Sequence, residues 1–161
     1  MPSGHLFLFL LATSLIWHCP SLSEAAKKPN IRFVFADDQG FETMRDFGHY
    51  DVETPNLDRL VRSGTTFTHA YNQGSWSGAV CVASRTMLNT GRFVWRAHRI
   101  YKTTNQERQA GRFWSVMMKK AGYHTGMVGK WHLGFESPNI PNDRGFDFFH
   151  GFLADMMDDY W

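Results

Sequence analysis

The sequence predicts an α/β protein, because segments with the pattern of buried strands alternate with segments that have the pattern of amphipathic helices. Residues 31–36 form a nearly continuous apolar run, which is typical of a strand buried on both faces of a parallel sheet. Residues 111–121 place aromatic and methionine side chains at helical spacing, and residues 123–128 have the pattern of the next strand. We therefore expect a mostly parallel sheet with helices on its faces.

The other elements are predicted from capping residues and spacing. Thr54 and Pro55 are residue types that favour the N-cap and first turn of a helix. We therefore expect a helix over residues 54–64. A further helix is expected over residues 81–89. Residues 138–161 are rich in glycine and aromatic side chains, which favours loop and short strand.

Composition and the N-terminal segment narrow the class of protein. The 161 residues are 43% hydrophobic and 16% aromatic, which excludes a disordered chain, and a net charge of +2 without a basic run excludes a nucleic-acid partner. Residues 6–17 are mostly apolar but too short to span a bilayer, and Ser23 and Ala25 are small residues suited to the −3 and −1 positions of a cleavage site. We expect an export signal over residues 1–25, with an uncleaved anchor as the alternative.

Two adjacent carboxylates, Asp37 and Asp38, follow the first expected strand. In open α/β sheets, ligands bind outside the carboxyl ends of the strands. Adjacent carboxylates repel each other, and their hard oxygen atoms suit Ca²⁺ or Mg²⁺. The pair is therefore a candidate for a metal site, although most such pairs are solvated loop residues.

Cys81 begins an expected helix and is the single cysteine outside the expected signal. A lone cysteine in an exported protein indicates an intermolecular disulfide, a reactive thiol or a modification site, and the alternative is an inert buried side chain. Arg85 follows it by four residues, and Thr-Gly-Arg occupies residues 90–92. Because the first turn of a helix attracts anions, an anionic substrate suits a nucleophile at this position.

Lys130 and His132 lie where the strand predicted over residues 123–128 ends. Side chains two residues apart at a strand end can point to the same side. A Lys-x-His pattern carries little information by itself, and it gains weight here because Asp37 and Cys81 precede it in the chain.

These motifs together resemble the sulfatase family, which carries Cys-x-(Pro or Ala)-x-Arg, as at residues 81–85, and a second signature like Gly-Lys-Trp-His-Leu-Gly at residues 129–134. The resemblance covers nearly all of residues 29–153. It implies an alkaline-phosphatase-like α/β/α sandwich, of which residues 26–161 would be an incomplete N-terminal part. Ala83 stands where proline is commoner in the family, which limits the maturation enzymes that can act on Cys81.

The resemblance also implies roles for the site residues. Cys81 would be converted to formylglycine by a formylglycine-generating enzyme, and its hydrated aldehyde would attack sulfur and then release sulfate. Asp37, Asp38 and residue 81 would bind Ca²⁺, with Mg²⁺ as the alternative. Arg85 would orient the modified residue. Lys130 would contact a sulfate oxygen, and His132 would hydrogen-bond the modified residue and help sulfate to leave.

The function implied is that of an exported sulfuric ester hydrolase acting on a sulfated small molecule or polysaccharide. It would be periplasmic or extracellular, or lysosomal in an animal, without stable membrane insertion. A phosphoester or phosphonate hydrolase of the same superfamily and a secreted non-catalytic binding protein are the alternatives. Nothing after Gly134 matches the family's remaining site residues, so we expect a truncated and inactive chain. Asp155, Asp158 and Asp159 are expected in a solvated loop.

Overall fold

The structure is a computed structural model that describes residues 28–78 and 80–155. The chain divides into two compact units, Met1–Ala36 and Asp37–Trp161. The export signal expected over residues 1–25 lies outside the described residues. Within the described part of the chain, no helix combines the length and the apolar character that crossing a membrane requires.

Residues 28–36, the described part of the first unit, contain neither helix nor strand. The prediction of a strand buried on both faces over residues 31–36 is wrong, because Ile31 is 62% exposed and Val34 is 77% exposed. An apolar run becomes a buried strand only where other strands bond to its backbone and other layers cover its faces. In the described residues, the sheet consists of two later strands, and neither pairs with this run.

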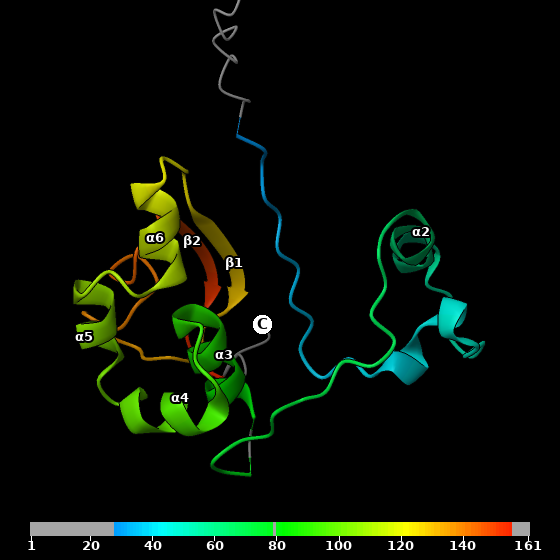
Figure 1. The fold of residues 1–161 in the computed structure, drawn as a ribbon, viewed down its shortest axis with the longest axis horizontal. Helices are drawn as coiled ribbons and strands as arrows, with labels where there is room; N and C mark the ends of the chain where they lie inside the picture. Colours follow the sequence, from blue (N-terminus) through cyan, green and yellow to red (C-terminus); the bar gives the residue numbers. More distant parts are fainter. Residues whose placement is uncertain (1–27, 79, 156–161) are drawn as a thin grey trace, which may run out of the picture. The chain divides into compact units, whose positions relative to one another are not determined.

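The second unit is a mixture of helices and two parallel strands (Figure 1). In chain order its elements are the short 3₁₀ helices η1 (Phe41–Thr43) and η2 (Arg45–Phe47), the helices α2 (Pro55–Ser63), α3 (Cys81–Thr90), α4 (Val94–Ile100), α5 (Thr104–Gln109) and α6 (Trp114–Lys120), and the strands β1 (Gly126–Lys130) and β2 (Phe148–Phe152).

The helix α2 confirms the prediction made from Thr54 and Pro55, although the cap works differently from expectation. The Thr54 hydroxyl donates to Asp58 Oδ1 at 2.8 Å and accepts from the Arg45 N–H group at 3.1 Å, instead of accepting from an N–H group in the first turn of α2. The same carboxylate oxygen accepts from the Asp46 N–H group at 3.2 Å. The buried Asp58 therefore ties the first turn of α2 to η2.

The helices α3 and α6 were both predicted, and a buried amide side chain joins them. Asn89 in α3 donates to the Arg85 carbonyl at 2.9 Å and accepts from the Trp114 indole N–H group of α6 at 3.0 Å. A buried polar side chain with both of its groups bonded fixes the two helices in one arrangement.

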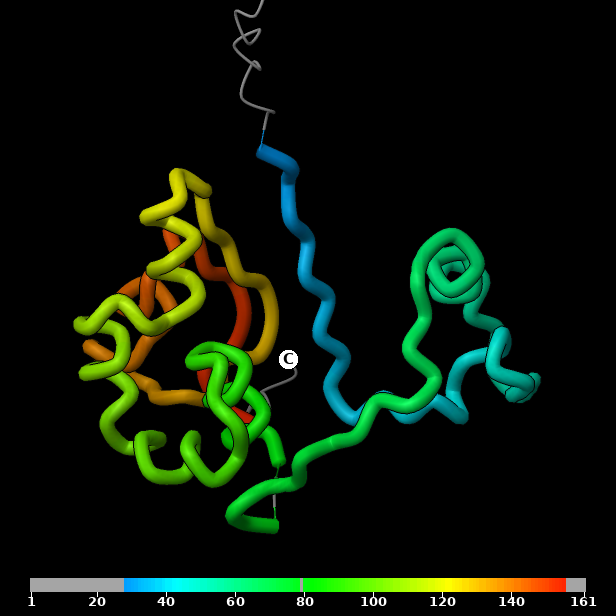
Figure 2. Tube along the Cα trace, in the orientation of Figure 1, coloured from blue at the N-terminus to red at the C-terminus, as the bar shows by residue number. Residues whose placement is uncertain are grey.

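The strands β1 and β2 run side by side in the same direction, as the backbone trace shows (Figure 2). Their register pairs Gly126 with Phe148 and Lys130 with Phe152. The α/β class with a parallel sheet is confirmed on this small scale. Because parallel strands end at the same edge, the residues that follow β1 and those that follow β2 emerge together.

The hydrophobic core lies directly beside the end of β1. It is formed by Phe113, Trp131 and Phe146, and the rings of Trp131 and Phe146 meet edge to face with centroids 6.1 Å apart. The buried guanidinium of Arg144 lies 5.4 Å from the centre of the Phe113 ring. Since Trp131 directly follows Lys130, the core and the carboxyl end of β1 share one stretch of backbone.

Candidate active site

The first component of the site is the beginning of α3. Cys81 is the first residue of this helix, and its side chain is half-buried. Arg85 lies one turn later and is buried. Its Nε group lies 3.4 Å from the carbonyl oxygen of Lys130, to which it donates. This contact joins α3 to the end of β1.

The second component is the segment that leaves β1. Hydrogen bonds continue the strand pairing past the end of β1, since the N–H groups of Trp131 and His132 donate to the carbonyls of Phe152 and Leu153, each at 3.0 Å. His132 has a left-handed backbone, with φ of 56°. The left-handed region is unfavourable for a residue with a Cβ atom, so this conformation is held by the surrounding bonds.

Lys130 connects the two components through its ammonium group. Its Nζ atom lies 3.3 Å from Cys81 Sγ and 3.0 Å from Asp37 Oδ2, and it also bonds to Asp155 Oδ1. Burial of the side chain would lower the pKa of Lys130, but the hydrogen bonds to Asp155, Asp37 and Cys81 outweigh burial and raise it. The ammonium group therefore stays charged, with only 8% of the side chain exposed.

The two aspartates after residue 36 behave differently from each other. Asp37 forms ion pairs with Lys130 at 3.0 Å and with Arg85 at 3.6 Å, so it joins the site. Asp38 is exposed and has φ of 56°. Within residues 28–78 and 80–155, no hydrogen bond or ion pair brings Asp38 to the other candidate residues, and its role as a metal ligand stays a prediction.

Asp155 is a member of the site that the sequence analysis missed. It lies outside the helices and strands with 55% of its side chain exposed, which agrees with the expected solvated loop, but its carboxylate also bonds to Lys130 and lies 3.5 Å from the Nδ1 atom of His132. The hydrogen bond from Lys130 holds the pKa of Asp155 below its ordinary value. Asp155 follows β2 as His132 follows β1, so the rule that parallel strands end at one edge could have found it. Asp158 and Asp159 lie outside the described residues.

The imidazole of His132 lies in a mostly buried and positively charged environment. Burial is the largest influence and lowers the pKa of His132, and the charges of Lys130 and Arg85 lower it further, while Asp155 and Asp37 oppose them. The ring is therefore neutral near pH 7, so that it can accept one proton.

A divalent cation fits this arrangement under one condition. Asp37 and Cys81 both contact the Lys130 ammonium group, so their side chains already converge on a positive charge. The carboxylate of Asp37 is a hard donor that suits Ca²⁺ or Mg²⁺, but a thiol is a soft donor that does not. The residues fit such a cation once oxygen replaces the sulfur at position 81.

Comparison with known proteins shows which family the chain belongs to. The family model described as Sulfatase matches residues 29–160, which is most of the chain. The chain belongs to the sulfatase family. No solved structure matches the chain.

Curated sulfatases are similar to this chain over a limited part of their own length. Arylsulfatase G of dog is 34% identical over 146 residues, which cover 85% of this chain and 26% of that protein. N-acetylgalactosamine-6-O-sulfatase of Bacteroides thetaiotaomicron is 38% identical, covering 76% of this chain and 26% of that protein. Human N-acetylgalactosamine-6-sulfatase is 35% identical, covering 80% of this chain and 26% of that protein. The sulfatase chain described here thus spans about a quarter of these relatives.

Proposed function

We propose that this chain supplies the nucleophile and part of the sulfate-binding site of a sulfuric ester hydrolase, with Cys81 converted to formylglycine. Membership of the sulfatase family supports sulfate-ester chemistry. The observation that carries the proposal is the 3.3 Å contact between Lys130 Nζ and Cys81 Sγ. Because a sulfate monoester is an anion, a fixed cation beside the nucleophile binds it and stabilises the charge that develops on its oxygen atoms.

The other residues position the reacting groups and move a proton. Arg85 donates to the Lys130 carbonyl and pairs with Asp37, so it keeps the end of β1 against the first turn of α3. This arrangement holds residue 81 and Lys130 at a constant separation, which lowers the entropy cost of reaction. His132 hydrogen-bonds the modified residue 81 and accepts its proton as sulfate leaves.

Two groups complete the proposed site. Formylglycine supplies a hydrated aldehyde, which has one hydroxyl to attack sulfur and another through which sulfate is expelled. A cation bound by Asp37, Asp38 and residue 81, Ca²⁺ or alternatively Mg²⁺, supplies positive charge that acidifies the attacking hydroxyl. The chain's own contribution is to place Lys130, Arg85 and His132 around that hydroxyl.

The substrate class, partner and location follow from the same proposal. The substrate is a sulfated small molecule or polysaccharide, and the maturation partner is a formylglycine-generating enzyme. Residues 1–25 act as an export signal, so that the product is periplasmic, extracellular or, in an animal, lysosomal. N-terminal sequencing of the exported protein tests this assignment, and a product that still begins at Met1 contradicts it.

Covalent trapping tests the sulfatase proposal directly. A serine at position 81 can attack sulfur but has no second hydroxyl with which to expel sulfate. We therefore expect Cys81→Ser, incubated with 4-nitrophenyl sulfate and Ca²⁺, to gain the mass of one sulfuryl group on the peptide that contains position 81. The good leaving group makes a general acid unnecessary for this step.

The controls separate sulfate from phosphate chemistry. Cys81→Ala has no nucleophile and should gain no mass. Incubation with 4-nitrophenyl phosphate should label Cys81→Ser more slowly than the sulfate ester does. Faster labelling by the phosphate ester would assign the chain to phosphoester hydrolysis instead. For maturation, mass spectrometry of the unmutated chain from a host with the converting enzyme should find formylglycine at position 81, and unmodified cysteine alone would contradict it.

A further inference from the structure

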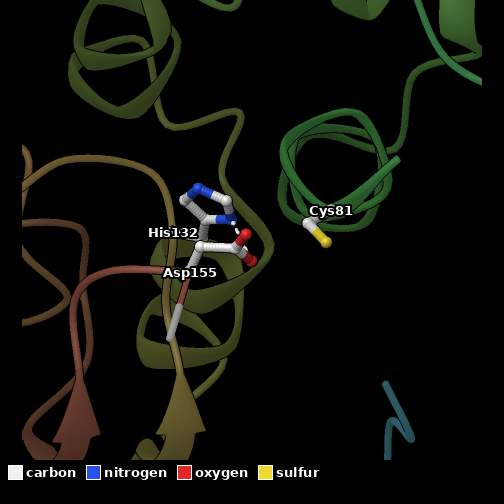
Figure 3. A group of neighbouring side chains, drawn as sticks. All are labelled: Cys81, His132 and Asp155. Carbon is white, nitrogen blue, oxygen red and sulfur yellow. Dashed lines mark ion pairs between the residues drawn. The ribbon is translucent and has the colours of Figure 1, made fainter. Parts of the chain in front are cut away.

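The unmodified form of the site has a ligand set of its own. One ligand atom each from Cys81, His132 and Asp155 lie within 4.8 Å of one another. Figure 3 shows the imidazole and the carboxylate next to each other, on the segments that follow β1 and β2, with Cys81 on the neighbouring turn of α3. Sulfur, imidazole nitrogen and carboxylate oxygen are the atoms that bind Zn²⁺ in proteins, and three protein ligands with one water form an open zinc site.

We propose that the thiol form of this protein binds Zn²⁺ through Cys81, His132 and Asp155, and that conversion of Cys81 to formylglycine abolishes the site. Binding replaces the S–H bond of Cys81 by a sulfur–zinc bond, and the thiol proton passes to the buffer. The zinc site itself concerns the unmodified chain, so it does not depend on the proposed function. The loss of the zinc site on maturation does rest on the proposed function, because it requires the conversion of Cys81 to formylglycine.

His132 is held ready to act as a ligand. Its Nδ1 atom is buried and has no hydrogen-bond partner among the described residues, although Asp155 Oδ1 lies 3.5 Å away. A buried polar atom without a partner is costly, and coordination to a metal ion would satisfy it. The backbone of His132 is fixed beside the segment that follows β2, because its N–H group donates to the Leu153 carbonyl at 3.0 Å. Asp155 follows Leu153 by two residues, so the same bond restrains both ligands.

The site already holds one positive charge between two of these ligands. Lys130 Nζ donates to Cys81 Sγ at 3.3 Å and also bonds to Asp155 Oδ1. Zinc must displace the ammonium group from both contacts, and the ammonium group keeps its ion pair with Asp37 at 3.0 Å. Zinc gains over the ammonium group because it accepts electron pairs from sulfur and nitrogen, which an N–H donor cannot do.

The chemistry of the ligands selects zinc over the hard cations. Ca²⁺ takes six to eight oxygen ligands, and Mg²⁺ also requires oxygen. The proposed site offers one protein oxygen, from Asp155, together with a sulfur and a nitrogen. Formylglycine carries no sulfur, so maturation removes the strongest zinc ligand and leaves oxygen donors at position 81. The thiol form and the mature form should therefore prefer different metals.

Zinc titration of the thiol form tests the proposal. The chain carries Cys19→Ser, so that Cys81 is its only thiol, and Zn²⁺ alone is titrated by calorimetry. We expect one zinc per chain. Each of Cys81→Ser, His132→Ala and Asp155→Asn should weaken binding at least about tenfold, which is the lower limit of what losing even an outer-shell partner of a metal site costs. Co²⁺ in place of Zn²⁺ should give a sulfur-to-metal charge-transfer band that Cys81→Ser lacks.

A second His–Asp pair provides the matched control. His124 Nδ1 lies 3.3 Å from Asp147 Oδ2, and the His124 side chain is 83% exposed. The described cluster around Cys81 does not include this pair. His124→Ala should therefore leave zinc affinity unchanged. Zinc binding that persists in Cys81→Ser, or that is lost in His124→Ala, would overturn the proposal.

Protection of Cys81 from alkylation keeps the test independent of any site variant. Saturating Zn²⁺ should slow the reaction of Cys81 with iodoacetamide at least about tenfold, because the bound sulfur is no longer a free nucleophile. Ca²⁺ at the same concentration should have no effect. An alkylation rate that Zn²⁺ leaves unchanged overturns the proposal. In formylglycine-containing protein, the calorimetric zinc signal should disappear, and if it persists the maturation part is wrong.

Discussion

Glu107 is another buried charged residue of the described chain, and the groups around it are the reverse of those around Lys130, with cations surrounding an anion. Two guanidinium groups surround one carboxylate, since Arg92 contacts Glu107 Oε2 at 2.6 Å and Arg112 contacts it at 2.8 Å. The hydrogen bond from Arg112 is the largest influence on the pKa of Glu107. Together with Arg92, and against the effect of burial, it lowers that pKa to about 2.

The first prediction is a loss of stability in acid that depends on Glu107. Its ordinary pKa is 4.5, so the folded state binds the proton less tightly than the unfolded state does. A lowered pKa contributes stability that is fully present above pH 4.5 and is lost as the pH falls towards about 2. We expect the urea concentration at the unfolding midpoint to decrease as the pH is lowered from 4.5 to about 2.

Glu107→Gln provides the control, because an amide does not titrate in this range. The variant should be less stable at pH 7 by about 1–3 kcal/mol, since Arg92 and Arg112 lose a charged partner. Its urea midpoint should change less than that of the unmutated chain between pH 4.5 and 2. Equal acid sensitivity of the two proteins would show that other carboxylates dominate.

At the scale of elements, the pairing of β1 with β2 depends on two glycines that face each other. Gly129 is paired with Gly151, and a Cβ atom at Gly151 would lie 2.0 Å from the Gly129 carbonyl oxygen. No side-chain rotation relieves a clash with backbone. We expect Gly151→Ala to destabilise the protein by about 3 kcal/mol or more, measured by urea unfolding. Gly126→Ala in the same sheet meets only ordinary contacts and should cost much less.

The end of α3 gives a third prediction. Gly91 closes the helix with φ of 63°, and no atom lies within 4 Å of a Cβ atom built there. Only backbone strain opposes a side chain, so Gly91→Ala should lower the free energy of unfolding by about 1–2 kcal/mol. Gly78 has equally open space without a positive φ. Gly78→Ala should be near neutral, and an equal loss in both variants would contradict the strain argument.

The sequence predicted those elements that local signals determine. The caps and spacing around residues 54–64, 81–89 and 111–121 identified α2, α3 and α6. The strand expected over residues 31–36 failed because burial depends on partner strands, which no local pattern reports. The short helices α4 and α5 were missed, since seven and six residues give a weak periodic signal.

The sequence predicted those residues of the site that belong to recognisable motifs. Cys81, Arg85, Lys130 and Asp37 were each singled out from the sequence, and the structure brings them into contact. The contact of Asp155 with Lys130 was missed, because a single aspartate outside any recognised motif has no local feature that indicates a site residue. Its position became evident only from the parallel pairing of β1 and β2.

At the scale of the whole molecule, the two units should differ in resistance to protease. Arg32 is exposed in a segment without helix or strand, whereas Arg144 is 1% exposed and donates to the Pro138 carbonyl at 3.0 Å. Proteases cut backbone that can leave its surroundings, so exposed irregular segments are cut first. We expect trypsin to cut after Arg32 long before it cuts after Arg144, as followed by mass spectrometry.

Unfolded protein is the control for the protease experiment. In urea, trypsin should cut after Arg32 and Arg144 at similar rates, because neither site is then protected. Early cutting after Arg144 in the native chain would contradict the burial of that side chain and the packing of Phe113 beneath it.

Trp131 has a consequence for how this protein can change in evolution. Its side chain is 1% exposed within the core, and its two chain neighbours, Lys130 and His132, belong to the site. A substitution that reshapes the core near Trp131 will therefore displace chemical groups on either side of it. Selection for stability and selection for chemistry therefore act on the same three positions. Substitutions at residues 130–132 should depend on one another, and compensating substitutions should arise at Phe113 and Phe146.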